Sequence, residues 1–211
     1  RPDLQGIIVV GDFDAKDMEK RIQKTFGDVE MPENPAEFKR FDVPATTEPI
    51  YVIDKDKEME RTIIEVIYKT PAIPYEMSNT TAAIAQSFLR SIIGSSLSAR
   101  LAELARKDDC PFAAADCGFD NYLLAKTEDC FVGAIIPKEG RDKEALTMLM
   151  QEIERARRFG ITGTEIFRAR QQIMSSVERS YDNRDKQYSS YYVNKAVRHF
   201  LSNRPYPGLA T

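Results

Sequence analysis

Histidine is nearly absent from this sequence, since the chain of 211 residues contains only His199. Imidazole is the usual general base near neutral pH and the commonest protein ligand for zinc. One histidine cannot build a His-x-x-Glu-His or His-Glu-x-x-His helix, in which two imidazoles on one face hold a single ion. We therefore expect neither a catalytic residue nor a metal site in this chain, and we interpret His199 as a surface residue near a helix end.

Cysteine is also scarce, and its spacing excludes the common cysteine motifs. The chain contains no Cys-x-x-Cys pair, and an odd number of cysteines leaves at least one unpaired. Buried structural thiols are the expected state, with a redox or metal role as the alternative. The residues concerned are Cys110, Cys117 and Cys130.

The chain also lacks a large excess of positive or negative charge, and it lacks long apolar runs. The net charge of -3 gives no general attraction to nucleic acid or to anionic lipid. No apolar run approaches the roughly 20 residues that a membrane-spanning helix needs, and no signal-peptide pattern is present. We expect no nucleic-acid partner and no membrane partner. A hydrophobic content of 42% with 30% charged residues is typical of one large globular domain or two small ones.

The first residues indicate a piece of a longer protein, because Arg1 is not a start methionine and the apolar run 7–10 follows closely. We expect a core strand at 7–10 and a helix at 15–26, capped by Asp14 and stopped by Gly27. Missing targeting signals then say little about the parent protein, whose compartment is left open between bacterial cytoplasm and periplasm.

A proline-rich connection divides the chain. Residues 31–49 carry many charges and few apolar side chains, which is typical of an exposed linker. We therefore expect residues 1–30 to end one domain and residues 50–211 to form another. The prolines are Pro32, Pro35, Pro44 and Pro49.

The pattern after the linker predicts an α+β fold, an antiparallel sheet with helices packed on one face. Strands are expected at 50–53, 62–68, 112–123 and 130–136, with a charged hairpin loop at 54–61. One helix is expected after Pro71 and Pro74, with its stop at Gly94, and further helices are expected at about 97–107 and at 142–159. The last helix is expected to begin at the capping box Thr162 to Glu165 and to bend at 182–184. The predicted inward stripes are Ala85, Phe88, Leu89, Ile92 and Ile93 in the first helix, and Ile166, Ala169, Ile173, Val177 and Tyr181 in the last.

No group of residues predicts chemistry by its spacing. Gly94-Ser95-Ser96 follows a helix and lacks the spacing of a phosphate loop, so a turn between helices is the simpler interpretation. Carboxylates are too numerous to discriminate, and no nucleophile and base lie together, which disfavours an independent enzyme that uses them. The carboxylates considered were Glu103, Asp108, Asp109 and Asp116.

Three segments in order carry a resemblance to a known family. They are Val9-Val10-Gly11-Asp12-Phe13-Asp14 leading to Phe26-Gly27-Asp28; Ile92-Ile93-Gly94-Ser95-Ser96-Leu97-Ser98-Ala99-Arg100-Leu101; and Gly160-Ile161-Thr162 with Glu165-Ile166 and Ala169-Arg170. Together they resemble the insulinase/pitrilysin (M16) zinc metallopeptidases over nearly the whole chain.

The resemblance implies a non-catalytic role. Each half of an M16 molecule has two similar α+β domains, and the zinc-binding helix belongs to the first. By that resemblance, residues 1–30 are the tail of a first domain, and the rest is the C-terminal, inactive domain of one half. Zinc would be held upstream of Arg1 in the parent protein. Expected partners are a peptide substrate, the zinc-bearing domain, and the other half or a paired subunit.

The resemblance also implies one substrate-binding residue, Arg106. In many family members an arginine after the second short helix is followed seven residues later by a tyrosine that contacts substrate. Here Phe112 follows Arg106 after six residues, so the spacing is one short and the hydroxyl is missing. The alternative function is a scaffold subunit of the same fold, similar to the core subunits of mitochondrial respiratory complexes, whose parent lost the zinc helix.

Overall fold

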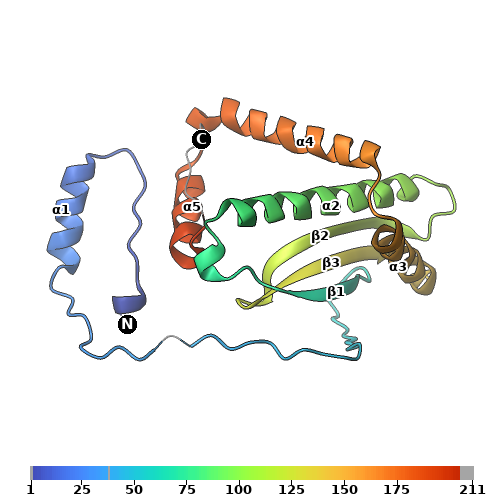
Figure 1. The fold of residues 1–211 in the computed structure, drawn as a ribbon, viewed down its shortest axis with the longest axis horizontal. Coiled ribbons are helices and arrows are strands. Elements are labelled where there is room, and N and C mark those ends of the chain that lie inside the picture. Colours follow the sequence, from blue (N-terminus) through green and yellow to red (C-terminus); the bar gives the residue numbers. More distant parts are fainter. Residues whose placement is uncertain (1, 38, 205–211) are drawn as a thin grey trace. The chain divides into compact units, whose positions relative to one another are not determined.

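The computed structural model describes residues 2–37 and 39–204. Figure 1 shows the order of helices and strands along the chain. By its internal contacts the chain divides into two compact units. The first contains residues 1–39, 75–79 and 178–211, and the second contains residues 40–74 and 80–177.

The second unit is built on an antiparallel sheet of three strands in the order β1-β3-β2 (Figure 1). The strands are β1 (Ile64–Pro71), β2 (Phe112–Ala125) and β3 (Glu128–Pro137). Helices α2 and α3 pack against one face of this sheet (Figure 1). The predicted α+β class, with an antiparallel sheet and helices on one face, is confirmed.

Helix α2 (Thr81–Ala105) corrects a prediction, because it runs unbroken through Gly94 instead of ending there. Thr80 begins the helix by accepting a hydrogen bond from the backbone N–H of Ala83. A Cβ on Gly94 would lie 3.1 Å from the carbonyl oxygen of Cys117 on β2. Glycine therefore serves here to let the helix approach the strand closely, and the second short helix expected at 97–107 is the C-terminal part of α2.

The core lies between the C-terminal half of α2, the sheet and α3 (Asp142–Phe159). The side chains of this core cluster are 0–3% exposed, and burying each large apolar side chain contributes about 1.5–3 kcal/mol to stability. Prediction of α3 from the sequence was right at both ends, and Gly160 follows it at φ 74°. The cluster comprises Leu97, Leu101, Cys110, Phe112, Cys117, Ile135, Ala145 and Leu149.

Helix α4 (Gly163–Asp182) begins with the predicted capping box. The backbone N–H of Thr162 donates to Glu165 Oε2 at 2.8 Å, and the backbone N–H of Glu165 donates to Thr162 Oγ1 at 3.4 Å. The expected bend is a break, since α4 ends at Asp182 and α5 (Ser189–Ser202) begins after a short 3-10 turn.

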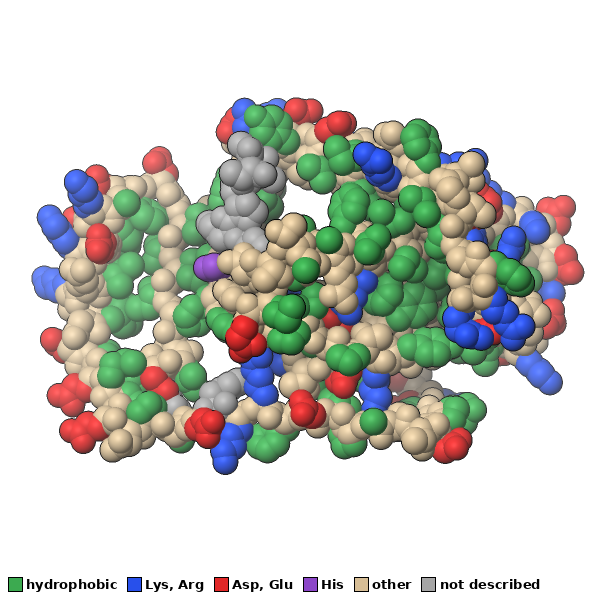
Figure 2. All heavy atoms as spheres, in the orientation of Figure 1, with side chains coloured by type: hydrophobic (Ala, Val, Ile, Leu, Met, Phe, Trp, Pro, Cys, Tyr) green, Lys and Arg blue, Asp and Glu red, His purple; other side chains and the backbone are tan. Residues whose placement is uncertain are grey.

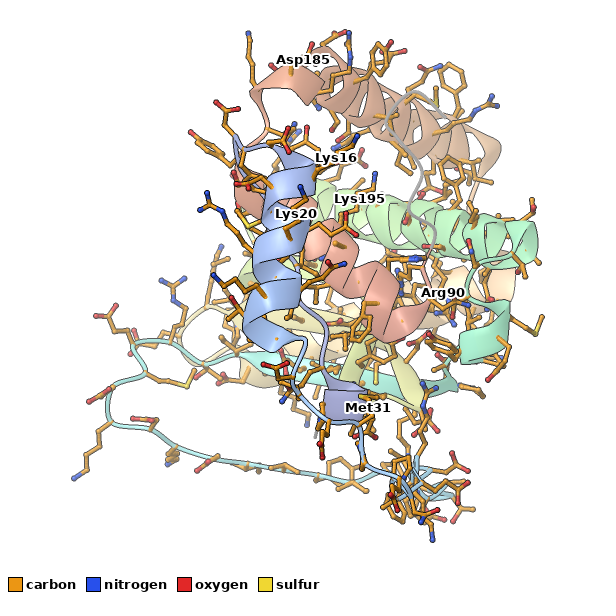
Figure 3. The ribbon with its side chains drawn as sticks, turned by 90° about the vertical axis from the view of Figure 1, so that its left-hand side faces the viewer. Lys16, Lys20, Met31, Arg90, Asp185 and Lys195 are labelled. Atoms are coloured by element: carbon orange, nitrogen blue, oxygen red, sulfur yellow. The ribbon has the colours of Figure 1, made fainter. Side chains whose placement is uncertain are left out.

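The first unit contains α1 (Ala15–Phe26) and α5. Helix α1 has the predicted bounds, and Asp14 Oδ1 accepts a hydrogen bond of 2.8 Å from the backbone N–H of Asp17. Lys16 and Lys20 extend from this helix one turn apart (Figure 3).

Two predicted strands, at 7–10 and 50–53, were wrong, because these residues form no strand and lie outside the sheet. Ile53 is 91% exposed, so this apolar run is not part of the core. A strand is stable only beside a partner that takes up its backbone groups, and neither run pairs with any described segment. Apolar β-branched residues indicated the strand propensity, whereas pairing depends on distant segments.

The inward stripes predicted for α2 and α4 were wrong in large part. Phe88 and Leu89 are 39% and 60% exposed, and on α4 only Ala169 is buried while Val177 is 53% exposed. The buried core cluster takes only Leu97 and Leu101 from α2, both in its C-terminal half, and the predicted stripe residues of the N-terminal half do not belong to it. Hydrophobic side chains therefore remain at the surface between α2 and α4 (Figure 2).

Candidate functional site

Arg106, the residue expected to contact substrate, lies at the C-terminal cap of α2. Its backbone N–H bonds to the carbonyls of Glu103 and Leu104, and its side chain is exposed. Within the described part of the chain, no hydrogen bond or ion pair holds the guanidinium. A guanidinium presents a planar fork of donors that fits a carboxylate or a pair of carbonyl oxygens, so Arg106 can take an external partner.

Phe112, which follows Arg106 after six residues, is fully buried, with 0% exposure. Its ring belongs to the core cluster at the start of β2. This position therefore cannot present a side chain to a ligand. The burial gives a physical reason for an aromatic ring without a hydroxyl here, because a buried phenol would require a hydrogen-bond partner.

The second and third segments of the sequence resemblance meet through Arg100. Its Nη2 lies 2.7 Å from Glu165 Oε2, and its Nε also bonds to Glu165 Oε1. The same Nη2 donates to the carbonyl oxygen of Gly160 at 3.2 Å. The hydrogen bond from Arg100, helped by Thr162, lowers the pKa of Glu165 to about 2. One carboxylate thus caps α4 and ties its first turn to α2.

Ser98 on α2 bonds to both backbone groups of Cys117 on β2. Its hydroxyl oxygen accepts from the Cys117 N–H at 3.0 Å and lies 3.0 Å from the Cys117 carbonyl oxygen. The hydroxyl is also 2.5 Å from Asp116 Oδ1. Helix α2 therefore covers the outer edge of β2 at this point, and Gly94 brings the helix backbone against the same residue.

Arg90, also on α2, fixes the hairpin formed by β2 and β3. Its Nη1 lies 2.5 Å from Asp129 Oδ2, and its guanidinium lies 5.2 Å from the centre of the Phe119 ring. The two charged side chains are 14% and 5% exposed. Removing one partner would leave a nearly buried charge unpaired, so we interpret this pair as structural rather than as a ligand site.

The carboxylates considered in the sequence do not converge. Glu103 faces Arg168 at 3.6 Å, Asp109 pairs with Arg141 at 2.9 Å, and Asp116 contacts Ser98, while Asp108 is exposed. His199 contacts the carbonyl oxygen of Arg204 through Nδ1 at 2.7 Å. Across residues 2–37 and 39–204, no three His, Cys, Asp or Glu side chains lie together as metal ligands would. The donor set present here does not fit a zinc ion.

The three cysteines are free and buried, as expected for structural thiols. Burial, with a smaller contribution from Asp116, raises the pKa of the Cys117 thiol to about 12. Burial also raises the pKa of Cys130. Thiols in this state are poor nucleophiles and poor metal ligands, because the thiolate is the reactive form.

Sequence reasoning missed the Arg100–Glu165 pair and the contact of Ser98 with Cys117. Arg100 and Ser98 both lie in the second segment of the family resemblance, but their partners Glu165 and Cys117 are distant from them in sequence. The Thr162–Glu165 spacing predicted the capping box, but nothing in it showed that the same carboxylate also holds Arg100.

None of the described helices is long and apolar enough to cross a membrane.

Comparison with known proteins places this fold in a family of peptidases. The family model described as the Peptidase M16 inactive domain matches residues 1–173. A curated relative, the "Zinc protease PQQL-like" protein of Arabidopsis thaliana, is 24% identical over 204 residues, which cover 96% of this chain and 18% of that protein. The chain therefore spans about a fifth of the length of this relative.

Solved structures share the architecture at low sequence identity. The periplasmic protease PqqL from Escherichia coli superposes with a TM-score of 0.81 at 17% identity, covering 95% of this chain and 22% of PqqL. Its first half alone gives a TM-score of 0.80, with 42% of that half covered. The predicted insulinase family protease from Yersinia pestis gives 0.74 at 13% identity, over 92% of this chain and 41% of that one. These matches show the fold.

Proposed function

The chain belongs to the Peptidase M16 inactive-domain family, and we propose that it is a non-catalytic domain of an M16-type zinc metalloendopeptidase. In this proposal the parent hydrolyses peptide bonds, and this domain forms part of the wall and of the substrate-contact surface of the peptide chamber. The observation that carries the proposal is the match of the inactive-domain family model over residues 1–173.

Zinc would be supplied by another domain of the parent. The Arabidopsis relative is named a zinc protease, and this chain covers 18% of it, which leaves ample sequence for a metal-binding domain there. We propose further that residues 1–30 complete a preceding domain, that 31–49 link the two, and that 50–211 form the inactive domain. The partners would be the peptide substrate, the zinc-bearing domain, and the other half or a paired subunit.

The contribution of this chain would be positioning. A wall that holds a peptide near a metal raises its effective concentration there and excludes bulk water. Arg106 is exposed at a helix end and can bind a peptide carboxylate or carbonyl group. The core that fixes α2 on the sheet would keep this guanidinium in place relative to the wall.

The test of Arg106 uses the parent protein with its zinc-bearing domain. Arg106→Ala should raise KM for an unstructured peptide with little change in kcat, because the contact is made equally in the bound substrate and in the transition state. Arg106→Lys should recover part of the loss, and Lys107→Ala, on the neighbouring exposed residue, is the matched control. Unchanged KM in Arg106→Ala would remove this residue from the substrate surface.

The test of the domain assignment uses the 211-residue chain. Zinc measured by elemental analysis after dialysis should be substoichiometric, and the chain should not cleave an unstructured peptide. One tightly bound zinc per chain, or chelator-sensitive cleavage, would contradict the proposal. A parent sequence without His-x-x-Glu-His would instead favour the scaffold subunit.

A further inference from the structure

The two edges of the sheet differ in a way that bears on association. In the order β1-β3-β2, strands β1 and β2 both lie at edges. On β2, Ser98 takes up the N–H and the C=O of Cys117, and α2 lies against the backbone there. This edge is therefore blocked in its middle. Natural sheets commonly protect an edge in this way, because open backbone groups recruit another strand.

The hydrogen-bond pattern shows which groups of β1 point outward. Because both backbone groups of Cys117 turn away from β3, those of its register partner Gly133 turn toward β1. Gly133 pairs with Val66, so the backbone groups of Val66 point inward and those of its neighbours point outward. The carbonyl of Asp129, opposite Thr70, also faces β1, since the Thr70 hydroxyl donates to it at 3.3 Å.

The outward groups of β1 thus belong to Glu65, Ile67 and Lys69. Among the described residues, these three make no backbone hydrogen bond beyond the sheet. Their side chains share the face of the sheet away from the helices, because Val66 and Ile64, on the opposite side, pack against the core. We call this row of outward-facing residues, Glu65, Ile67 and Lys69, the β1 edge.

We propose that the β1 edge binds the β1 edge of a second copy of this chain in an antiparallel pair centred on Ile67. In that register the three outward-facing residues of each copy exchange backbone hydrogen bonds with those of the other. Glu65 then lies opposite Lys69 of the second copy, and the two-fold axis repeats this pair. The edge is charge-complementary to itself, which selects a second copy over an unrelated strand.

The helix side of the sheet fits the same register. Val66 lies opposite Tyr68 of the second copy, and Tyr68 is 42% exposed in the single chain. An aromatic ring beside a β-branched residue is a favourable cross-strand pair. Lys69 Nζ already donates to the Pro44 carbonyl oxygen at 2.7 Å, and an ammonium has donors left for a carboxylate. The two sheets would join into one continuous sheet, with α2 and α3 of both copies on the same face.

Sedimentation equilibrium of the 211-residue chain tests the pairing. The chain should associate to a dimer. Glu65→Lys and Lys69→Glu should each place like charges opposite one another and weaken the dimer about tenfold or more. The double variant Glu65→Lys with Lys69→Glu exchanges the charges and should restore the affinity of the original chain. This restoration separates the proposed register from any other interface.

A second variant tests the backbone. Ile67→Pro removes an outward N–H and leaves the bonds to β3 in place, so it should weaken the dimer while the thermal unfolding of the monomer shows that the fold persists. A chain that stays monomeric, a dimer unaffected by the single charge changes, or a double variant that does not recover would each overturn the proposal. Binding of an unrelated extended peptide to a monomeric chain would overturn it as well.

Discussion

Arg100 on α2 and Glu165 on α4 form an ion pair with two contacts, one of them 2.7 Å between Nη2 and Oε2. Their side chains are 11% and 20% exposed, so the pair is shielded from solvent much more than an ordinary surface pair. It joins two helices whose sequences are 65 positions apart at this contact.

Glu165→Gln should reduce stability in a pH-dependent manner. The pKa of Glu165 is lowered from 4.5 to about 2 by the Arg100 hydrogen bond and the Thr162 cap. A lowered pKa in the folded state stabilises the fold above the unfolded pKa, and this contribution disappears as pH falls from 4.5 to 2. At pH 7 the variant should lose about 2 kcal/mol, and its urea unfolding should depend less on pH in that interval.

Glu154→Gln is the control for this experiment. Its pKa is also lowered to about 2, by hydrogen bonds from Arg157 and Arg158, but the residue pairs along one solvent-facing helix turn. Exposed pairs contribute little, so the loss should be much smaller than for Glu165→Gln. If both variants lost the same free energy of unfolding, the Arg100–Glu165 pair would contribute no more to stability than an exposed surface pair.

Gly94→Ala should destabilise the chain despite the higher helix propensity of alanine. The new methyl group would lie 3.1 Å from the Cys117 carbonyl oxygen and 3.2 Å from the Gly118 Cα, both of which belong to the β2 backbone. Separating helix and strand would offset the roughly 1 kcal/mol that alanine gains in a helix. We expect a lower midpoint in thermal unfolding measured by circular dichroism.

Gly163→Ala provides the matched substitution, since a Cβ at this position meets nothing within 4 Å. Gly163 is the first residue of α4, and the variant should be as stable as the original chain or more stable, by up to about 1 kcal/mol. A stabilised Gly94→Ala variant would mean that the β2 backbone yields easily at Cys117.

Ser98→Ala and Ser96→Ala should differ although both serines lie on α2. Removing the Ser98 hydroxyl leaves the N–H and the C=O of the buried Cys117 without their partner, at a cost of about 1–3 kcal/mol. The buried Ser96 hydroxyl has no hydrogen-bond partner among the described residues, so its removal should be neutral or stabilising. Chemical denaturation of both variants measures the difference, and equal losses would contradict the role given to Ser98.

Native thiols should react slowly with a colorimetric disulfide reagent at pH 8. All three are buried, and the pKa of Cys117 is raised to about 12, so little thiolate is accessible. Reaction should become complete only after unfolding in guanidinium chloride. Fast labelling of one thiol in the folded chain would indicate an accessible cysteine and would reopen a redox role.

Local patterns predicted local structure well. The bounds of α1 and α3 and the caps at Asp14 and Thr162 follow from side chains a few residues apart, which the sequence displays directly. Gly94 was misread because glycine usually stops a helix, whereas here a strand about twenty positions later requires it. The strand expected at 50–53 failed for a similar reason, since pairing needs a partner that no local pattern supplies.

The candidate site was less predictable than the fold. Arg106 came from family resemblance, and the structure adds that its side chain is exposed and that Phe112 is not. The contacts of Arg100 with Glu165 and of Ser98 with Cys117 depend on the three-dimensional approach of separate motifs. The spacing of residues along the sequence does not show which distant residues come into contact in the fold.

The uneven burial of α2 has a consequence for local opening. Its turns around Leu97 and Leu101 are enclosed by the sheet, whereas Ile84 and Leu89 are 53% and 60% exposed. Helical turns in water depend mainly on tertiary packing, so amide hydrogens near Ile84 should exchange with deuterium well before those near Leu101. A protein that covers Ile84 and Leu89 would slow this exchange, so the exchange rates of these turns can report where a neighbouring domain attaches.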